Sequence, residues 1–190
     1  TRGGEWFARW VFRRATFISV RDEASRVRLE SWSMNKNIIQ TFDPVVLLIQ
    51  SAKTSESSQN VFVIIPRNNS DAAFVARAMT LARERIPQEI VILSLQPDDV
   101  GERAVCRKLL ADLDGRGRVV AIRSLQDLTR EVARASFVLS QRYHGALVAL
   151  VLGKAMEVIS QGAGDKLSEL PSAVDLPSCI DHAREGERQL

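Results

Sequence analysis

Ser140-Gln-Arg-Tyr-His-Gly-Ala-Leu-Val-Ala-Leu-Val-Leu-Gly153 is the stretch of this 190-residue chain that decides its fold. The residues that lead into it, Ser136-Phe-Val-Leu-Ser140, form an apolar run that predicts a strand, and the small apolar residues that close it predict a buried helix. Arg142 and His144 fall where the predicted strand ends and the helix begins. Open α/β sheets bind ligands beyond the carboxyl ends of their strands, so the stretch predicts an α/β fold with polar groups at a ligand crevice.

The same alternation of strand and helix runs from Val61 to the end of the chain. Apolar segments predict strands at 61–65, 89–95, 118–121, 136–139 and 156–159. The segments between them predict helices at 70–85, 98–113 and 124–133, one after Arg142, and a short one at 165–170. Ser70 or Asn69 is expected to cap the first of these helices, and Ser124 with Asp127 has capping-box spacing. Strands of this kind predict a Rossmann-like parallel sheet with helices on both faces.

Residues 1–50 carry a shorter version of this pattern. Trp6, Phe7, Trp10 and Val11 predict an amphipathic helix. A strand is predicted at 15–20, a helix at 23–32 with Asp22 or Ser19 as its cap, and a short strand at 37–41. The polar, Ser-rich residues that follow Gln50 predict a linker at 51–60. The chain is therefore divided into 1–50, the linker 51–60, and a second domain at 61–190.

Composition excludes several classes of function. The net charge of +3 and the pI of about 9.2 fit an ordinary mixed surface or a basic cleft for an anion, and no basic run interleaved with aromatics points to nucleic acid. Two distant cysteines and two histidines predict neither a disulfide framework nor a metal site. Neither GxGxxG nor a P-loop is present. No apolar run approaches the ~20 residues of a transmembrane helix, so we expect a cytoplasmic protein.

The residues that follow the predicted strands are the candidates for chemistry. Arg142 could grip a carboxylate or phosphate, and His144 could move a proton near neutral pH, or both simply begin a helix. Arg21 follows a strand, but could equally pair with its acidic neighbours on the surface. Lys166 lies at the end of a small-residue turn that could hold an anion, or is solvated. Asp43 could accept a bond from a substrate hydroxyl, or only shape the turn before Pro44.

Three segments, in order, resemble the polysaccharide pyruvyltransferase family. Ile18-Ser-Val-Arg-Asp-Glu-Ala-Ser25 is similar to its (I/V)SVRDxxS segment, and Thr41-Phe-Asp-Pro44 to its DP step. The segment from Arg142 to Gly153 is similar to its RxHxxxxAxxxG motif and is followed, as in the family, by Val158-Ile-Ser160 and a lysine. The resemblance extends over residues 5 to 176. It implies a GT-B-like architecture of two Rossmann-like halves, of which this chain carries the C-terminal half and the tail of the first.

The resemblance also implies a function and roles for single residues. The family transfers an enolpyruvyl-derived group from phosphoenolpyruvate to a sugar and leaves a pyruvate ketal. His144 would be the general acid or base, and Arg21 would grip the carboxylate or the phosphate of the donor. Lys166 would neutralise the phosphate, and Arg142 would orient the site or bind an anion. Phosphoenolpyruvate would be a substrate and no cofactor or metal would be required. The acceptor would be a sugar or a lipid-linked saccharide, and peripheral attachment to the inner face of the membrane stays open.

Two other functions stay open. A GT-B glycosyltransferase that uses a nucleotide sugar would need an acidic residue for the ribose, for which Glu157 and Asp165 are the candidates. A non-catalytic binding or assembly domain is the second. The resemblance further implies that the opening segments of the family, with their Gly/Asn-rich loop, are missing here, so we expect a fragment whose activity on its own is in question.

Overall fold

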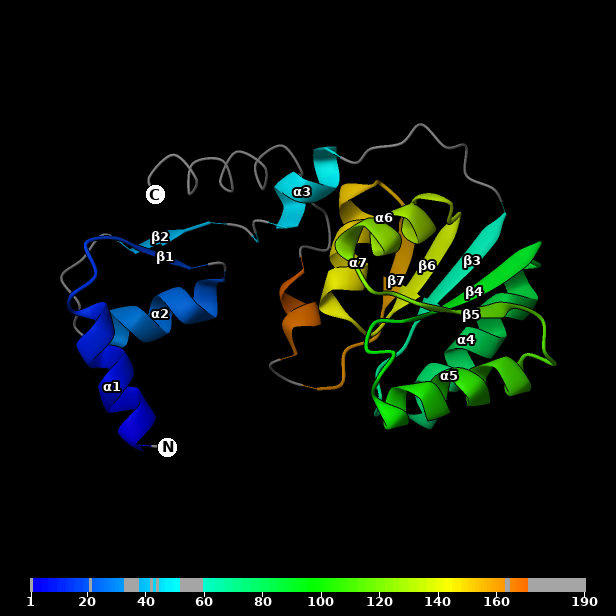
Figure 1. Cartoon of the computed structure of the whole chain (residues 1–190), viewed down its shortest axis with the longest axis horizontal. Helices are drawn as coiled ribbons and strands as arrows, with labels where there is room; N and C mark the ends of the chain where they lie inside the picture. Colours follow the sequence, from blue (N-terminus) through cyan, green and yellow to red (C-terminus); the bar gives the residue numbers. More distant parts are fainter. Residues whose placement is uncertain are drawn as a thin grey trace. The chain divides into compact units, whose positions relative to one another are not determined.

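The fold was analysed in a computed structural model (Figure 1). The structure describes residues 2–20, 22–32, 38–41, 43, 45–51, 60–162 and 165–170. The chain divides into two compact units, one of Thr1–Leu47 with Ala173–Leu190 and one of Leu48–Ser172. The predicted linker falls largely outside the described residues, so the division into 1–50, 51–60 and 61–190 stays a prediction.

The first unit is built on two parallel strands joined by a helix. Its elements are α1 (Arg2–Phe12), β1 (Ile18–Val20), α2 (Glu23–Ser31) and β2 (Ile38–Gln40), and α3 (Val45–Ser51) follows them. Ile18 lies opposite Ile38 in the strand pair and packs with Leu29 and Trp32 in a small core. The side chain of Asp22, one of the two caps predicted for α2, accepts a hydrogen bond from the backbone N–H of Ser25 at 2.7 Å. The helix α3 was not predicted, because its five apolar residues are too few to show a helical period.

The apolar stripe predicted on α1 is present but exposed. Trp6 is 68% exposed and Phe7 is 60% exposed, while the core is contacted instead by Ala8 and Phe12. The helix is therefore amphipathic as predicted, with its aromatic side turned away from the described core of its unit.

The second unit is a five-stranded parallel sheet in the order β5-β4-β3-β6-β7. Its strands are β3 (Val61–Ile65), β4 (Glu89–Ser94), β5 (Arg118–Ala121), β6 (Phe137–Ser140) and β7 (Ala155–Val158). Its helices are α4 (Ala72–Arg85), α5 (Val100–Asp112), α6 (Leu125–Ala133), α7 (Tyr143–Val151) and the 3₁₀ turn η1 (Lys166–Glu169). The predicted α/β class and parallel, Rossmann-like sheet are confirmed, and each predicted strand of this unit is found within two residues of its expected bounds.

Helices cover both faces of this sheet, and Figure 1 shows α4 and α5 on one face and α6 and α7 on the other. The central strand β3 is buried at every position. Phe62 and Ile64 pack in the α4 and α5 core, which contains Phe74, Cys106 and Leu109. Burial on both faces explains why the strands are apolar throughout instead of alternating. In the described part of the chain, no helix has the length and apolar character that crossing a membrane needs.

The cap predicted for α4 was wrong. Asp71 is the cap, and its carboxylate accepts a hydrogen bond from the N–H of Phe74 at 2.9 Å. Ser70 instead bonds to the backbone of Arg67 and to the side chain of Gln141. The capping box of Ser124 and Asp127 is confirmed, since Ser124 Oγ accepts from the Asp127 N–H at 3.1 Å and donates to its carboxylate at 2.8 Å.

Gly145 allows α7 to lie close against β3. A Cβ atom at this position would stand 2.6 Å from Ile65 Cδ1 and 2.9 Å from Ser140 Oγ, and both distances are far below van der Waals contact. Ile65 is fully buried and cannot turn aside freely. The glycine next to His144 is therefore required by packing against a neighbouring strand.

We expect the substitution Gly145→Ala to lower the free energy of unfolding by about 1–2 kcal/mol. Overpacking costs about 1–3 kcal/mol, and the better helix propensity of alanine offsets up to about 1 kcal/mol. Urea unfolding followed by circular dichroism measures the difference. Adding Ile65→Val removes the atom that clashes most, so the double variant should lose less than the sum of the single losses. Full additivity would contradict the proposed contact.

Candidate functional site

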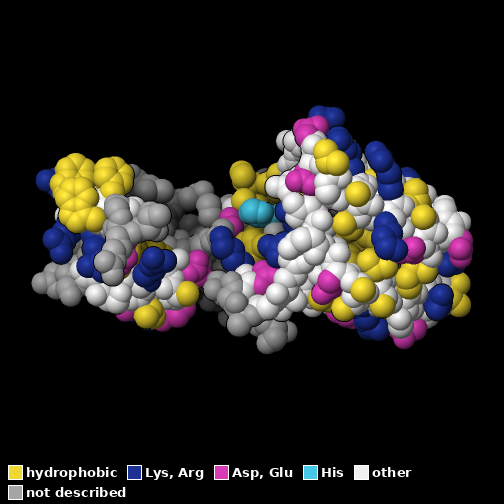
Figure 2. All heavy atoms as spheres, turned by 90° about the horizontal axis from the view of Figure 1, so that it is seen from below, with side chains coloured by type: hydrophobic (Ala, Val, Ile, Leu, Met, Phe, Trp, Pro, Cys, Tyr) yellow, Lys and Arg dark blue, Asp and Glu magenta, His cyan; other side chains and the backbone are white. Residues whose placement is uncertain are grey.

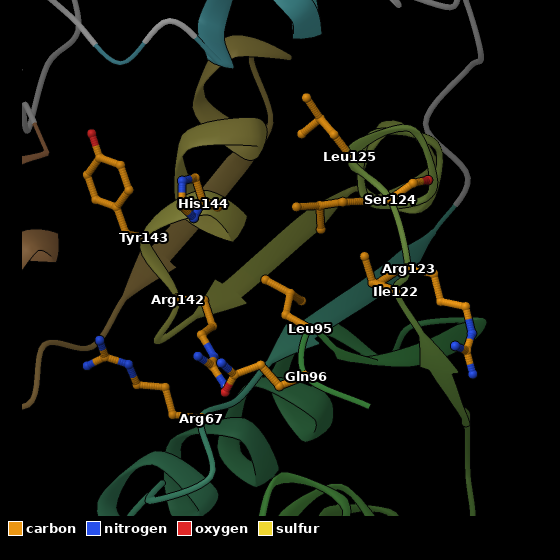
Figure 3. Close-up of a pocket in the computed structure, with 11 residues that line it drawn as sticks. Arg67, Leu95, Gln96, Ile122, Arg123, Ser124, Leu125, Arg142, Tyr143 and His144 are labelled. Atoms are coloured by element: carbon orange, nitrogen blue, oxygen red, sulfur yellow. The ribbon is translucent and has the colours of Figure 1, made fainter. Parts of the chain in front are cut away.

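A cavity of about 430 Å³ lies at the carboxyl edge of the five-stranded sheet. Its wall is formed by the segments that directly follow four neighbouring strands: Arg67 after β3, Leu95 and Gln96 after β4, 122–125 after β5, and 142–144 after β6. Figure 3 shows Leu95, Arg142 and His144 around one open space. The cavity brings Arg142 and His144 together, as their position after a strand predicted.

The cavity lies beside the point where the order of the strands reverses. The chain moves outward from β3 to β4 and β5, then returns to place β6 on the other side of β3. The connections that leave β3 and β6 therefore go to opposite faces of the sheet. This divergence opens a crevice between the two strand ends, where ligands of open α/β sheets bind.

Arg142 is held by groups that follow two strands and by one group from α5. Its guanidinium donates to the carbonyl of Pro66 at 3.3 Å, to Gln96 Oε1 at 2.8 Å, and to the carboxylate of Glu102. Burial, together with the charge of Arg67, lowers the pKa of Arg142 from its usual value. An arginine starts from so high a pKa that it stays charged, and the carboxylate of Glu102 compensates that charge.

Glu102 is the fully buried partner of Arg142. Its carboxylate also accepts hydrogen bonds from Ser94 Oγ at 3.0 Å and from the backbone N–H of Gln96 at 2.7 Å. Glu102 lies in the first turn of α5, where a negative charge is further stabilised by the helix dipole. The ion pair therefore joins α5 and the end of β4 to the start of α7, and it commits Arg142 to a structural contact.

His144 lies in the first turn of α7 and is exposed. Its ring meets the ring of Tyr143 edge-on, with centroids 5.5 Å apart. Figure 3 shows the imidazole on the cavity side of α7, and in Figure 2 the histidine is visible at the surface with basic side chains near it. A ligand in the cavity can therefore reach the imidazole directly.

Arg67 was not singled out in the sequence, although it also lines the cavity. It follows β3 after a single proline, so the rule that selected Arg142 applies to it equally. Its Nη1 donates to Gln161 Oε1 and to Asp165 Oδ2, each at 3.1 Å. Arg123 is the other arginine of the lining, and Figure 3 shows its guanidinium pointing away from Arg142 and His144.

The remaining predicted residues lie elsewhere. Lys166 is exposed at the start of η1, next to the Asp165 that pairs with Arg67, and is not among the cavity-lining residues. Asp43 belongs to the first unit and is buried, and its carboxylate accepts a hydrogen bond from the N–H of Val45 at 3.1 Å. Asp43 thus shapes the turn into α3, and its role toward a substrate stays a prediction. Arg21 lies outside the described residues.

The carboxylates considered for a nucleotide ribose are both paired with arginines. Arg77 grips Glu157 through two hydrogen bonds of 2.7 and 2.8 Å, and Arg67 holds Asp165. No group of three or more His, Cys, Asp or Glu side chains suited to a metal is present among the residues that the structure describes. Cys106 is buried, and its burial raises the pKa of the thiol to about 11.

A sequence model of the polysaccharide pyruvyl transferase family matches residues 1–160, so the chain belongs to this family. The resemblance noted in the sequence is confirmed, and the family indicates a transferase of pyruvyl groups that acts on a saccharide. The match includes Arg21, Asp43, Arg67, Arg142 and His144, and it ends before Lys166. A search of curated proteins found no match.

The pairing of Arg142 with Glu102 makes a prediction about stability. We expect Glu102→Leu to lower the free energy of unfolding by about 3–5 kcal/mol, because it leaves a partly buried guanidinium without its carboxylate. Adding Arg142→Met should recover most of this loss, since the charge is removed as well. Chemical unfolding of the two single variants and the double variant measures the coupling. Independent, additive losses would show that the two side chains do not act as a pair.

Proposed function

We propose that this protein transfers the pyruvyl group of phosphoenolpyruvate to a saccharide as a ketal, with His144 as its general acid. The observation that carries the proposal is the cavity in which His144 lies beside the cations Arg67 and Arg142, in a chain of the pyruvyl transferase family. Phosphoenolpyruvate has one carbon to be protonated and two anionic groups to be held. The site offers a proton donor and cations for these needs.

In the proposed reaction, the imidazolium of His144 gives its proton to the methylene carbon of phosphoenolpyruvate. The adjacent carbon becomes an oxocarbenium-like centre and is attacked by one saccharide hydroxyl. The C–O bond to phosphate breaks, and a second hydroxyl adds to the same carbon to close the ketal. One hydroxyl proton restores the histidine and the other leaves with inorganic phosphate, so atoms and charges balance. Cations beside the departing phosphate lower the barrier.

We propose the other roles on the basis of the family resemblance. Arg21 would hold the donor, Lys166 would neutralise phosphate from the start of η1, and Asp43 would orient an acceptor hydroxyl. Arg142 would act as a positioning residue, because its guanidinium is already bonded to Glu102, Gln96 and Pro66. No step calls for a cofactor or metal, and phosphoenolpyruvate enters as a substrate. The acceptor would be a free or a lipid-linked saccharide.

The proposal is tested by the release of phosphate from phosphoenolpyruvate in the presence of saccharide acceptors, with the ketal detected by mass spectrometry. We expect His144→Ala to lower the rate by at least about 100-fold, the usual loss for a general acid, with an unchanged thermal unfolding curve. Lys108→Gln is a matched control on the exposed side of α5, away from the cavity, and should retain full activity. Wild-type turnover by His144→Ala would remove the histidine from the mechanism. Transfer from a nucleotide sugar, with none from phosphoenolpyruvate, would refute the proposed function.

A further inference from the structure

The two ion pairs at the cavity differ in how readily they can be exchanged for a ligand. Arg142 has an 18% exposed side chain and its partner Glu102 is fully buried. Arg67 has a 31% exposed side chain and its partner Asp165 a 7% exposed one, so this pair is the less buried of the two. Separating an ion pair costs more the less water reaches the two charges that are left behind. Arg67 is therefore the arginine that an incoming anion can recruit.

Asp165 keeps two backbone donors when Arg67 leaves. Its carboxylate accepts hydrogen bonds from the backbone N–H groups of Gln161 at 2.9 Å and Leu167 at 3.2 Å. Burial raises the pKa of Asp165, but these two N–H groups together with Arg67 outweigh it, and the pKa ends below its usual value. Two sets of donors thus stabilise the carboxylate as an anion: the two backbone N–H groups, and Arg67.

Arg67 has donors to spare. Only Nη1 is bonded, to Gln161 and Asp165, whereas Nε and Nη2 have no hydrogen-bond partner among the residues that the structure describes. Nε and Nη2 form one edge of the guanidinium fork, and this edge matches two oxygens of a phosphate. Arg67 lines the cavity, so rotation of its side chain can present that edge to a ligand there.

The backbone of Arg67 is fixed while its side chain can turn. The N–H of Arg67 donates to Ser70 Oγ at 2.9 Å, and the N–H of Ser70 donates back to the Arg67 carbonyl at 3.2 Å. Ser70 Oγ also contacts Oε1 of the buried Gln141 at 2.5 Å, which ties this turn to the end of β6. A change of partner at the guanidinium therefore needs only side-chain rotation.

We infer that Arg67 binds the phosphate of the substrate and that Asp165 is a built-in competitor that holds Arg67 when no phosphate is present. The inference rests on the proposed function for the identity of the ligand, a phosphate monoester. Asp165 keeps the guanidinium oriented at the rim of the cavity and sets a threshold for anion binding. Weak anions fail to displace it, whereas a dianion that offers two oxygens to the fork succeeds.

The test measures dissociation constants for inorganic phosphate and for phosphoenolpyruvate by calorimetry. Arg67→Gln should weaken both by at least about tenfold, since a charge-assisted contact is lost. Asp165→Asn should tighten both by about two- to fivefold, because the competitor loses its charge, while its single amide oxygen can still accept from one of the two N–H groups, that of Gln161 or that of Leu167. In the Arg67→Gln background, Asp165→Asn should bring no gain. If Asp165 only stabilised the turn, Asp165→Asn would weaken the binding of phosphate.

Glu157→Gln is the matched control. It removes the same charge from a carboxylate that pairs with another arginine, Arg77, whose side-chain exposure of 38% is close to the 31% of Arg67 and which is not among the cavity-lining residues. Its dissociation constants should stay at the wild-type value. Equal tightening by Glu157→Gln, weaker or unchanged binding in Asp165→Asn, or no binding of phosphate to the wild type would each overturn the inference.

The inference and the proposed function can fail separately. If the dissociation constant for inorganic phosphate rises in Arg67→Gln and falls in Asp165→Asn while no group is transferred from phosphoenolpyruvate, the anion site is supported and the proposed reaction is refuted. Transfer from phosphoenolpyruvate without those shifts would support the reaction and overturn the role of Arg67. Pyruvate, which carries the carboxylate but no phosphate, should bind equally to Arg67→Gln and to wild type. Weaker binding of pyruvate to Arg67→Gln would assign Arg67 to the carboxylate instead.

Discussion

The buried ion pair of Arg142 and Glu102 is the contact on which the carboxyl edge of the sheet depends. Arg142 extends from the end of β6 and contacts Pro66 and Gln96, which follow β3 and β4. Parallel strands end in loops that have no ladder partner, so side-chain contacts have to hold these loops in place. A charge paired in the interior does this strongly, because the pair cannot open without leaving a buried charge.

This ion pair distinguishes an arginine that stabilises the fold from an arginine that can bind an anion. The sequence alone does not distinguish them. Both Arg67 and Arg142 follow a strand and could bind an anion. The structure commits Arg142 to Glu102 and leaves Arg67 in a more exposed pair with Asp165, with its second edge available. The reacting group, His144, lies in the first turn of α7, on the framework that Arg142 and Gly145 keep in position. A rigid framework that carries one exchangeable cation suits a site that must first bind phosphate and then release it.

Most of the fold of the second unit could be predicted from the sequence, because its strands are apolar on both faces and its helices are separated by clear turns. The errors are confined to one helix cap, one short helix and the buried side of another helix. Asp71 caps α4 because Ser70 is engaged by Arg67 and Gln141, contacts that come from other parts of the chain. The short helix α3 lacked a periodic pattern, and the exposed aromatic residues of α1 show that amphipathicity does not say which side is covered.

The sequence by itself determined the family, the parallel α/β class and the importance of the Arg142 to Gly153 segment, because strand and helix periods and motif spacing are local properties. Only the tertiary structure decided which cations share a cavity with His144 and which are already neutralised. Glu102 and Asp165 lie 40 and 98 residues from the arginines that they hold, and no local pattern links such partners. The order of the strands brings them together, and burial then decides which pair is permanent and which can be exchanged.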